Sequence, residues 1–426
     1  MSVVKLLLIG LMAALSGASF AEGLTIEITK GSQTAVPIAI VPFGQQGSVG
    51  NVKISEVVDA DLAGSGFFKT LAEAEMLTTP TEPERVSFRE WQALGQDYMV
   101  VGQVQGNGGS FNIQFHLLNV HNGQLLMGYA MTVGGNELRR AAHHISDLIY
   151  EKLTGRKGAF NTRVAYVTSS AKGSGKQFML QVADADGYNP RTIAESPEPI
   201  MAPAWSPDGS KIAYVSFHTK RSAIYVQTLA SGQRESVAAY PGINGAPAFS
   251  PDGSRLAMTL SKDGSPDIYV MNLSSRALTR LTSGLSIDTE PAWSPDGSSI
   301  VFTSDQGGKP QLYMIPSSGG KATRLTFQGD YNARGRFSSD GRSLAMVNGS
   351  GGNYRIAVMD MASRTVNVLS EGSLDESPSF APNGSMILFA ANKGGRSVLS
   401  AVSVDGAMQQ KLDFQYGSVR EPAWAP

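Results

Sequence analysis

The sequence predicts an α+β N-terminal domain followed by an all-β, six-bladed β-propeller that is closed by the C-terminal strand. The motif Pro-Ala-Trp-Ser-Pro-Asp-Gly, at residues 203–209, recurs with variations through the second half of the 426 residues. Its aromatic positions are 44, 44, 44, 43 and 44 residues apart, a period typical of propeller blades. The last copy is cut short by the C-terminus. The six aromatic residues are Trp205, Phe249, Trp293, Phe337, Phe380 and Trp424.

Length and composition narrow the class of protein. A chain of 426 residues exceeds one compact core, so we expect two or more domains. Its 35 basic and 36 acidic residues nearly balance, whereas nucleic-acid and membrane-surface binders usually carry a basic excess. The absence of cysteine excludes disulfides, thiolate catalysis and zinc-thiolate sites. We therefore expect protein or small-molecule partners, and neither a cofactor nor a metal.

Residues 1–21 have the pattern of a secretory signal peptide. Lys5 supplies the positive charge, Leu6–Leu15 the apolar run and Ser19-Phe20-Ala21 the cleavage site. The apolar run is shorter than the roughly 20 residues that a spanning helix needs. We predict cleavage after Ala21 and a monomeric periplasmic protein without direct membrane insertion.

Residues 22–35 are predicted to be a separate partner-binding segment. Glu22–Lys30 alternates apolar and polar residues, as a strand does. It lies at the mature terminus, however, and termini fray unless they are held. A fixed edge strand and a mobile tail both stay open.

Residues 36–158 are predicted to form the α/β domain. Gly64 and Gly66 end its first helix, Gly155 ends its last, and Asn122-Gly123 joins two strands in a hairpin. No glycine motif for phosphate binding occurs. The predicted strands are 36–43, 97–105, 110–120 and 124–133, and the predicted helices are 51–67, 84–94 and 136–153.

His143 and His144 suggest a metal site on the last helix. Adjacent helical residues point about 100° apart, however, and the i, i+4 spacing of zinc-binding helices is absent. We therefore expect packed or solvated histidines.

Each repeat in residues 159–426 is predicted to be one blade of four antiparallel strands. In the copy that begins at Pro203, the strands are 202–206, 211–217, 223–228 and 235–239. Proline presets the turn after the first strand, and glycine accepts the left-handed conformation at its end. Turn residues, rather than calcium ligands, are expected at Asp208, Asp252, Asp296 and Asp340, because no EF-hand spacing follows.

The ring is predicted to close through its termini. Thr162–Ser169 matches the second strand of the other repeats but lacks the strand before it. Residues 422–426 supply the missing inner strand, which removes the open sheet edge.

The two faces of the propeller are predicted to differ. The Pro-Asp-Gly turns all lie on one face and repeat closely, whereas the links between blades lie on the other face and vary. Features that all blades share support the fold, so the variable rim is the candidate site.

The sequence lacks the motifs of hydrolases that carry a propeller. No G-x-S-x-G or H-E-x-x-H motif occurs. Five carboxylates gather near the channel mouth, and Arg334, Lys393 and Arg420 are available as partners. This pattern favours a protein-binding rim, with a propeller that binds or hydrolyses a small glycan or peptide as the alternative. The carboxylates are Asp288, Glu290, Asp375, Glu376 and Glu421.

The chain resembles the TolB family, periplasmic components of the bacterial Tol-Pal system. The resemblance rests on five stretches and extends over nearly the whole chain. They are Pro37–Phe43, Val100–Val104, the junction Lys152–Phe160 and Asn244–Gly253 with Thr289-Glu290-Pro291.

The resemblance implies a non-enzymatic adaptor for outer-membrane integrity and envelope constriction at cell division. Its implied partners are the lipoprotein Pal at the channel mouth and TolA at the mature N-terminus, with colicins and outer-membrane lipoproteins as further partners. Ile243 departs from the histidine that some relatives have before Asn-Gly-Ala-Pro. The implied Pal-binding residues are Met201, Asn244, Asp288, Thr289, Glu290, Asn332, Arg334, Asp375, Glu376, Arg420 and Glu421. The implied TolA-binding residues are Glu22, Leu24, Ile26 and Ile28.

Overall fold

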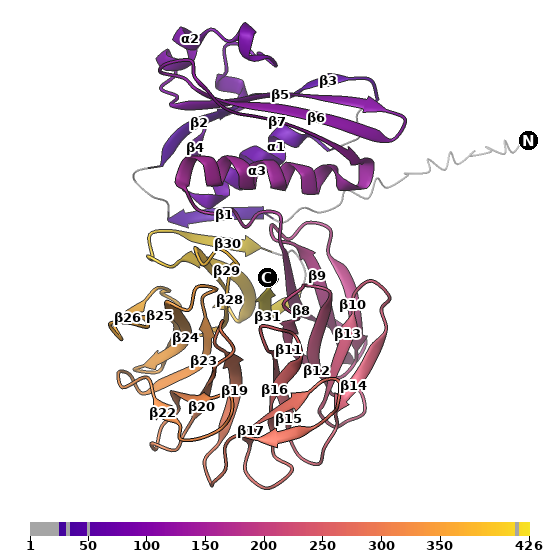
Figure 1. Cartoon of the computed structure of the whole chain (residues 1–426), viewed down its shortest axis with the longest axis vertical. Helices are drawn as coiled ribbons and strands as arrows, with labels where there is room; N and C mark the ends of the chain where they lie inside the picture. Colours follow the sequence, from indigo (N-terminus) through magenta and orange to yellow (C-terminus); the bar gives the residue numbers. More distant parts are fainter. Residues whose placement is uncertain (1–24, 31–34, 49–51, 414–416) are drawn as a thin grey trace, which may run out of the picture.

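The computed structural model describes residues 25–30, 35–48, 52–413 and 417–426. Figure 1 shows an N-terminal α/β domain stacked on one end of a β-propeller, with strand β1 between them. Among the described residues, no helix is long and apolar enough to cross a membrane. The predicted signal peptide lies outside the described residues.

The N-terminal domain is a mixed sheet with helices on both faces. Its strand order is β4-β2-β5-β6-β7, with β3 also paired to β5. The strands are β2 (Val36–Ile40), β3 (Gly44–Gln46), β4 (Phe68–Thr70), β5 (Tyr98–Asn107), β6 (Ser110–Asn119) and β7 (Leu125–Gly134). The helices are α1 (Ile54–Ser65), α2 (Phe88–Ala93) and α3 (Leu138–Thr154), with 3₁₀ turns η1 (Glu73–Glu75), η2 (Pro83–Arg85) and η3 (Gly135–Glu137).

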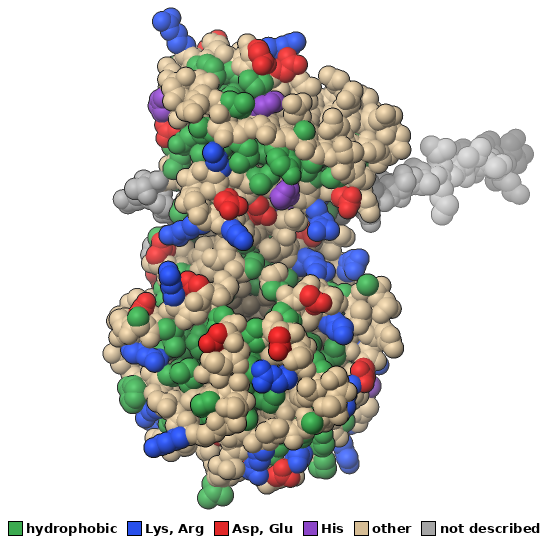
Figure 2. Space-filling model, viewed as in Figure 1, with side chains coloured by type: hydrophobic (Ala, Val, Ile, Leu, Met, Phe, Trp, Pro, Cys, Tyr) green, Lys and Arg blue, Asp and Glu red, His purple; other side chains and the backbone are tan. Residues whose placement is uncertain are grey.

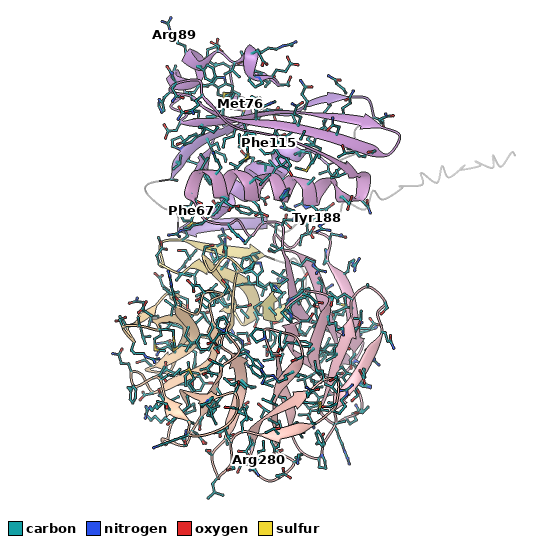
Figure 3. The ribbon with its side chains drawn as sticks, in the orientation of Figure 1. Phe67, Met76, Arg89, Phe115, Tyr188 and Arg280 are labelled. Atoms are coloured by element: carbon teal, nitrogen blue, oxygen red, sulfur yellow. The ribbon has the colours of Figure 1, made fainter. Side chains whose placement is uncertain are left out.

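The side chains of β2 point alternately to the two faces of the sheet and pack against helices on both. Ile38 and Ile40 pack with residues of α1 and α3, whereas Ala39 packs on the other face in a cluster that includes Trp91 of α2. Side chains of a strand point alternately to its two faces, so a strand buried on both faces is apolar throughout. Figure 3 shows Phe115 of β6 inside this domain.

The predicted helices differ from the observed ones mainly at their starts. α1 and α3 end at Gly66 and Gly155, both in the left-handed conformation, with φ of 63° and 71°. α3 begins after η3, and the predicted helix 84–94 is divided into the turn η2 and the short α2. Helix starts without a capping side chain are weakly marked in a sequence.

The propeller has six blades, as predicted. Each repeat contributes four antiparallel strands, and the innermost strand of blade 1 is the C-terminal strand β31, paired with β8. Blade 1 contains β31 (Ser418–Trp424), β8 (Arg163–Lys172), β9 (Gly175–Asp184) and β10 (Arg191–Ser196); blade 2 contains β11 (Ile200–Trp205), β12 (Lys211–Ser216), β13 (Ala223–Thr228) and β14 (Arg234–Ala238); blade 3 contains β15 (Asn244–Phe249), β16 (Arg255–Leu260), β17 (Asp267–Asn272) and β18 (Leu278–Arg280).

Blades 4 to 6 continue the same order from the channel outward. Blade 4 contains β19 (Asp288–Trp293), β20 (Ser299–Ser304), β21 (Gln311–Pro316) and β22 (Thr323–Arg324); blade 5 contains β23 (Tyr331–Phe337), β24 (Ser343–Ser350), β25 (Asn353–Asp360) and β26 (Val366–Val368); blade 6 contains β27 (Asp375–Phe380), β28 (Met386–Lys393), β29 (Arg396–Ser403) and β30 (Gln409–Asp413).

The repeated tryptophans join neighbouring blades. Nε1 of Trp205 in blade 2 donates a hydrogen bond to the carbonyl of Ala423 in blade 1, at 2.9 Å. Nε1 of Trp293 in blade 4 likewise donates to Ala248 in blade 3, at 3.0 Å. The recurring aromatic residue is therefore part of the frame, which its regular spacing had indicated.

β1 (Thr25–Lys30) adds a fifth strand to blade 6. It pairs antiparallel with β30, so that Ile26 lies opposite Leu412 and Ile28 lies opposite Gln410. Of the two alternatives for this segment, the structure has the edge strand. Glu22 and Leu24 lie outside the described residues.

Candidate interaction rim

The N-terminal domain contacts the face of the propeller that carries the Pro-Asp-Gly turns. In the corresponding turn of blade 6, Nδ2 of Asn383 donates a hydrogen bond to the carbonyl of Lys157, at 2.8 Å. The turn between β9 and β10 of blade 1 reaches α3 through an ion pair between Asp186 and Arg139. Figure 3 shows Phe67 and Tyr188 at this domain boundary. The links between blades therefore lie on the opposite face, which we call the rim.

The central channel opens at the rim. A cavity of about 1090 Å³ is lined by the innermost strands of all six blades. At the rim end of each innermost strand, the pairing with the next strand shifts register, and the first residue inside each shift has a positive φ. Irregularities of this kind redirect side chains. The six residues are Ala202 (φ 49°), Ala246 (47°), Glu290 (58°), Arg334 (56°), Ser377 (58°) and Glu421 (53°).

This ring of six residues is chemically one-sided. At blades 2 and 3 the position is occupied by the small residues Ala202 and Ala246. At the other four blades it is occupied by larger polar or charged residues, which interact with one another across the channel. Nε of Arg334 lies 2.7 Å from Oε1 of Glu290, and its Nη1 lies 3.4 Å from Oε2 of Glu421 and donates to Ser377. Burial opposes the charge of Arg334, but Glu421 and Glu290 outweigh this effect and raise its pKa above the ordinary value.

The network favours binding over acid–base catalysis. Glu290 and Glu421 both pair with the guanidinium of Arg334, and Oε2 of Glu290 also accepts a hydrogen bond from Thr303, at 3.1 Å. Each carboxylate is thus engaged by a donor. A catalytic pair would need one carboxyl group free to carry a proton to a substrate.

Four predicted site residues occupy one equivalent position, at the start of an innermost strand. All are buried, with exposed fractions of 4% or less. Nδ2 of Asn244 donates to the carbonyls of Tyr240 and Ser222, at 2.7 and 3.1 Å, and thereby holds the link before β15. All four residues lie beneath the rim, at the positions where the links between blades end. The four residues are Asn244, Asp288, Asn332 and Asp375.

The aspartates among these four carry an unsatisfied oxygen. Oδ1 of Asp288 and Oδ1 of Asp375 are buried and have no hydrogen-bond partner among the described residues. Burial raises the pKa of Asp375, although the hydroxyl of Ser370, which donates to its Oδ2, acts in the opposite direction.

The remaining predicted residues lie closer to solvent. Met201 is 39% exposed, Arg420 is exposed, and Thr289 and Glu376 are partly exposed. The hydroxyl of Thr289 lies 3.2 Å from that of Thr259 in the neighbouring blade. Thr289 therefore faces the cavity from a fixed position.

Large apolar residues on the rim went largely unpredicted. The exposed fraction reaches 99% for Leu285 and 73% for Phe327, both in links between blades. The signal available in the sequence was a large apolar residue inside a polar link, such as Ser283-Gly284-Leu285-Ser286. Exposed apolar residues gathered on one face mark an interaction surface. The others on this face are Met201, Ile243, Ile287 and Leu374.

On the face shown in Figure 2, acidic and basic side chains are interspersed and form no patch of a single charge. Apolar contact at the rim is therefore the stronger indication of a partner.

The two histidines of α3 are packed separately, as expected. The ring of His144 lies beside that of Tyr129, with centroids 6.2 Å apart, whereas His143 is buried against Asp61. The approach of Asp61 and Asp186 to His143 could not be predicted, because neither is close to it in sequence.

Comparison with known proteins gives consistent results. The model of the TolB amino-terminal domain matches residues 24–126, and that of the TolB beta propeller domain matches residues 150–426. Tol-Pal system protein TolB of Methylococcus capsulatus is 67% identical over 403 residues, covering 95% of this chain and 94% of that protein. Its counterpart in Xanthomonas oryzae pv. oryzae is 53% identical over 421 residues, covering 98% and 96%.

A solved structure agrees with these sequence matches. The crystal structure of TolB from Acinetobacter baumannii superposes with a TM-score of 0.88 and 43% sequence identity. The superposition covers 95% of this chain and 100% of that one. The similarity therefore includes both domains.

Proposed function

We propose, because this chain belongs to the TolB family of the Tol-Pal system, that it is a non-enzymatic periplasmic adaptor. In this proposal its rim binds the lipoprotein Pal, and its mature N-terminus binds TolA. Linking these two partners would support outer-membrane integrity and envelope constriction at cell division. The observation that carries the proposal is the set of exposed apolar residues around the channel mouth, on the face opposite the N-terminal domain.

The rim has the character of a protein-binding surface. Apolar area with polar surroundings is typical of such interfaces. Leu285, Phe327 and Ile243 supply apolar area, and Arg334 holds the charged centre in place. We propose that Met201, Thr289, Glu376 and Arg420 contact Pal, and that the four buried residues at the strand starts support the contact from below.

Thr289→Arg tests the rim. An arginine in place of the partly buried hydroxyl would intrude on the surface, so we expect binding to purified Pal to weaken by about tenfold or more, or about 1.4 kcal/mol. Unchanged binding together with an unchanged melting temperature would count against this placement.

The N-terminal segment is proposed to bind TolA. Its backbone already pairs with blade 6 through β1, and strands at a sheet edge can exchange one partner for another. Coupling between TolA and Pal would require two arrangements of this segment. We propose that residues 22–35 are that segment.

Deleting residues 22–35 tests the coupling. If Pal binding shifts the segment between two arrangements, the shortened protein binds Pal with a changed affinity. Equal affinities would remove the coupling but leave the adaptor role intact.

A small glycan or peptide in the channel is the second candidate, and the volume of about 1090 Å³ favours it. Titration with peptidoglycan fragments separates the two functions. Saturable binding that is lost when Arg334 is changed to Ala would support the small ligand, whereas binding to Pal alone supports the adaptor.

A further inference from the structure

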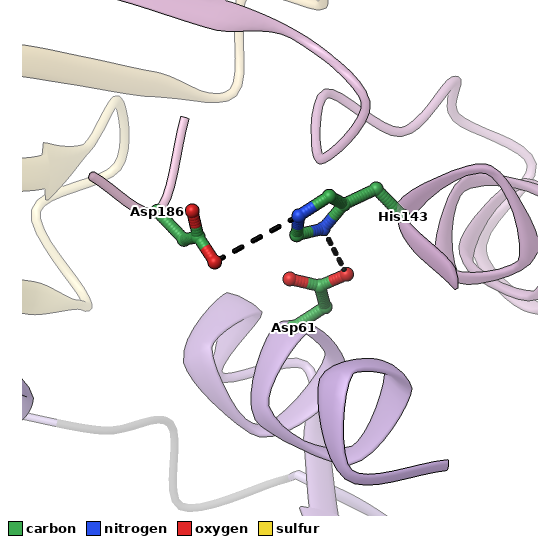
Figure 4. Close-up of side chains that lie close together, drawn as sticks. All are labelled: Asp61, His143 and Asp186. Atoms are coloured by element: carbon green, nitrogen blue, oxygen red, sulfur yellow. Dashed lines mark hydrogen bonds and ion pairs between the residues drawn. The ribbon is translucent and has the colours of Figure 1, made fainter. Parts of the chain in front are cut away.

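A buried histidine lies between carboxylates from both domains (Figure 4). His143 on α3 is 1% exposed, and its Nδ1 lies 2.8 Å from Oδ2 of Asp61 on α1. Its Nε2 lies 3.7 Å from Oδ2 of Asp186, in the turn between β9 and β10. Asp61 belongs to the N-terminal domain and Asp186 to the propeller. The imidazole therefore bridges the domain boundary.

The hydrogen bonds around Asp61 place one proton on this ring. Oδ2 of Asp61 accepts a hydrogen bond from the hydroxyl of Ser146, at 2.7 Å, and also faces Nδ1 of His143. A carboxylate that accepts from both neighbours requires a proton on Nδ1. Nδ1 is therefore the donor to Asp61.

The other ring nitrogen lacks a partner. Nε2 of His143 is buried and makes no hydrogen bond to any described residue. Without a proton, its lone pair would face the oxygen of Asp186, and two acceptors repel each other. With a proton, the same contact becomes an attraction between imidazolium and carboxylate.

The charges that face the ring favour this second proton. They are Asp61 from α1, Arg139 from α3, and Asp184 and Asp186 from β9 and its turn. Arg139 pairs with Asp186 and lies over the ring of Tyr188, 4.0 Å from its centroid. Around the ring, three carboxylates thus outnumber one guanidinium. Burial opposes a charge on His143, but Asp61 and Asp186 outweigh it and raise the pKa of the imidazole.

A metal ion fits the same residues less well. Asp61, His143 and Asp186 bring three possible ligand atoms within 4.8 Å of one another. However, Oδ2 of Asp186 is already paired with Arg139, and Nδ1 is directed at Asp61. A dication would have to displace the guanidinium and would meet its charge. A proton meets neither obstacle.

We propose that His143, when doubly protonated, is a pH-sensitive link that holds the N-terminal domain to the propeller. A cavity of about 90 Å³, lined by both domains, borders Asp61 and Asp186. When the imidazole becomes neutral, the contact with Asp186 turns repulsive and the boundary loosens beside this cavity. Neither Pal nor TolA takes part in this link.

The direction of the pH effect follows from the raised pKa. The stabilisation is fully present below the ordinary histidine value of 6.5 and is lost as the pH rises through the higher value in the folded protein. Attachment of the domains is therefore expected to weaken as the pH rises above 6.5 and through the raised pKa of His143.

NMR titration of the histidine Cε1 protons in the full-length protein, from about pH 5 to about pH 9, tests the link. His143→Gln assigns the signal, and His144→Gln is the matched control on the same helix. We expect His143 to titrate above 6.5, and Asp186→Asn to lower that value. A pKa at or below 6.5 for His143 in the unmodified protein would overturn the proposal.

Hydrogen exchange and zinc binding complete the test. After correction for intrinsic rates, amide protection in residues 184–188 should fall over the pH range in which His143 titrates, in the unmodified protein and in His144→Gln. His143→Gln should lack this step. If the unmodified protein and His144→Gln instead bind one equivalent of Zn²⁺ that His143→Gln does not, the site holds a metal and the proton link is wrong.

Discussion

Single residues of the Pro-Asp-Gly turns act through local hydrogen bonds. In the turn of blade 3, Oδ1 of Asp252 accepts from the hydroxyl of Ser250 and from the backbone and hydroxyl of Ser254. Gly253 follows with a φ of 71°. These donors lower the pKa of Asp252 to about 2. The turn therefore needs an acceptor at this position, and it needs no bound ion for that purpose.

Two substitutions of Asp252 separate hydrogen bonding from charge. Asp252→Ala should destabilise the protein by about 1 kcal/mol, whereas Asp252→Asn should cost less, because Asn383 fills the same position in blade 6 and accepts from Ser385. Urea unfolding at neutral pH measures both.

The charge should matter only above acid pH. The contribution of the carboxylate is present above its ordinary pKa of 3.8 and is lost as the pH falls through about 2. The difference between the unmodified protein and Asp252→Asn should therefore shrink over that range. If the difference in stability between the two proteins stays constant with pH, the charge of Asp252 does not contribute to the stability.

Exposed apolar residues permit a cleaner test of binding than buried ones do. Because Leu285 is 99% exposed, Leu285→Ser should change the stability by less than about 0.5 kcal/mol. Its affinity for Pal should nevertheless fall if the rim is the contact surface. Surface plasmon resonance beside a thermal melt measures both quantities. Full affinity would remove Leu285 from the proposed interface.

At the scale of elements, the C-terminal strand holds the ring closed. Trp424 Nε1 donates to Thr162 at 2.8 Å, its backbone N donates to Ser379, and Ala425 N donates to Arg163. The strand thus contacts blades 1 and 6 together. A propeller without it would have an unpaired inner edge.

Deleting residues 421–426 should destabilise the whole ring. Loss of Trp424 and of these hydrogen bonds is expected to cost at least about 3 kcal/mol, or about 3 °C or more in melting temperature for a chain of this size. Differential scanning calorimetry measures the change. A shortened protein that melts within about a degree or two of the intact one would contradict this role.

Some elements could be predicted from sequence and others could not. The period of the aromatic residues and the incomplete first repeat were sufficient to predict six blades and the closure of the ring by the C-terminal strand. The pairing of β1 with β30 joins residues far apart in the chain, and no local pattern encodes it. The same holds for Asn244, whose burial depends on Ser222 and Tyr240. Tertiary contacts decide such positions.

At the scale of the whole molecule, the two faces of the propeller differ. The N-terminal domain and β1 occupy one face of the propeller, and the apolar rim occupies the other (Figure 1). The repeated motif forms the rigid frame that positions the rim residues. Sequence comparison among the blades pointed to the rim as a region, but the burial of individual rim residues required the structure.

The measurement that tests the adaptor most directly is calorimetric titration of the full-length protein with the purified soluble domain of Pal. Three proteins are compared: the unmodified chain, Thr289→Arg on the rim and Ala277→Arg in an exposed turn on the opposite face. We predict that Thr289→Arg weakens binding by about tenfold or more, and that Ala277→Arg binds as the unmodified chain does. Equal binding by all three proteins, at equal melting temperatures, would contradict a partner site at the rim.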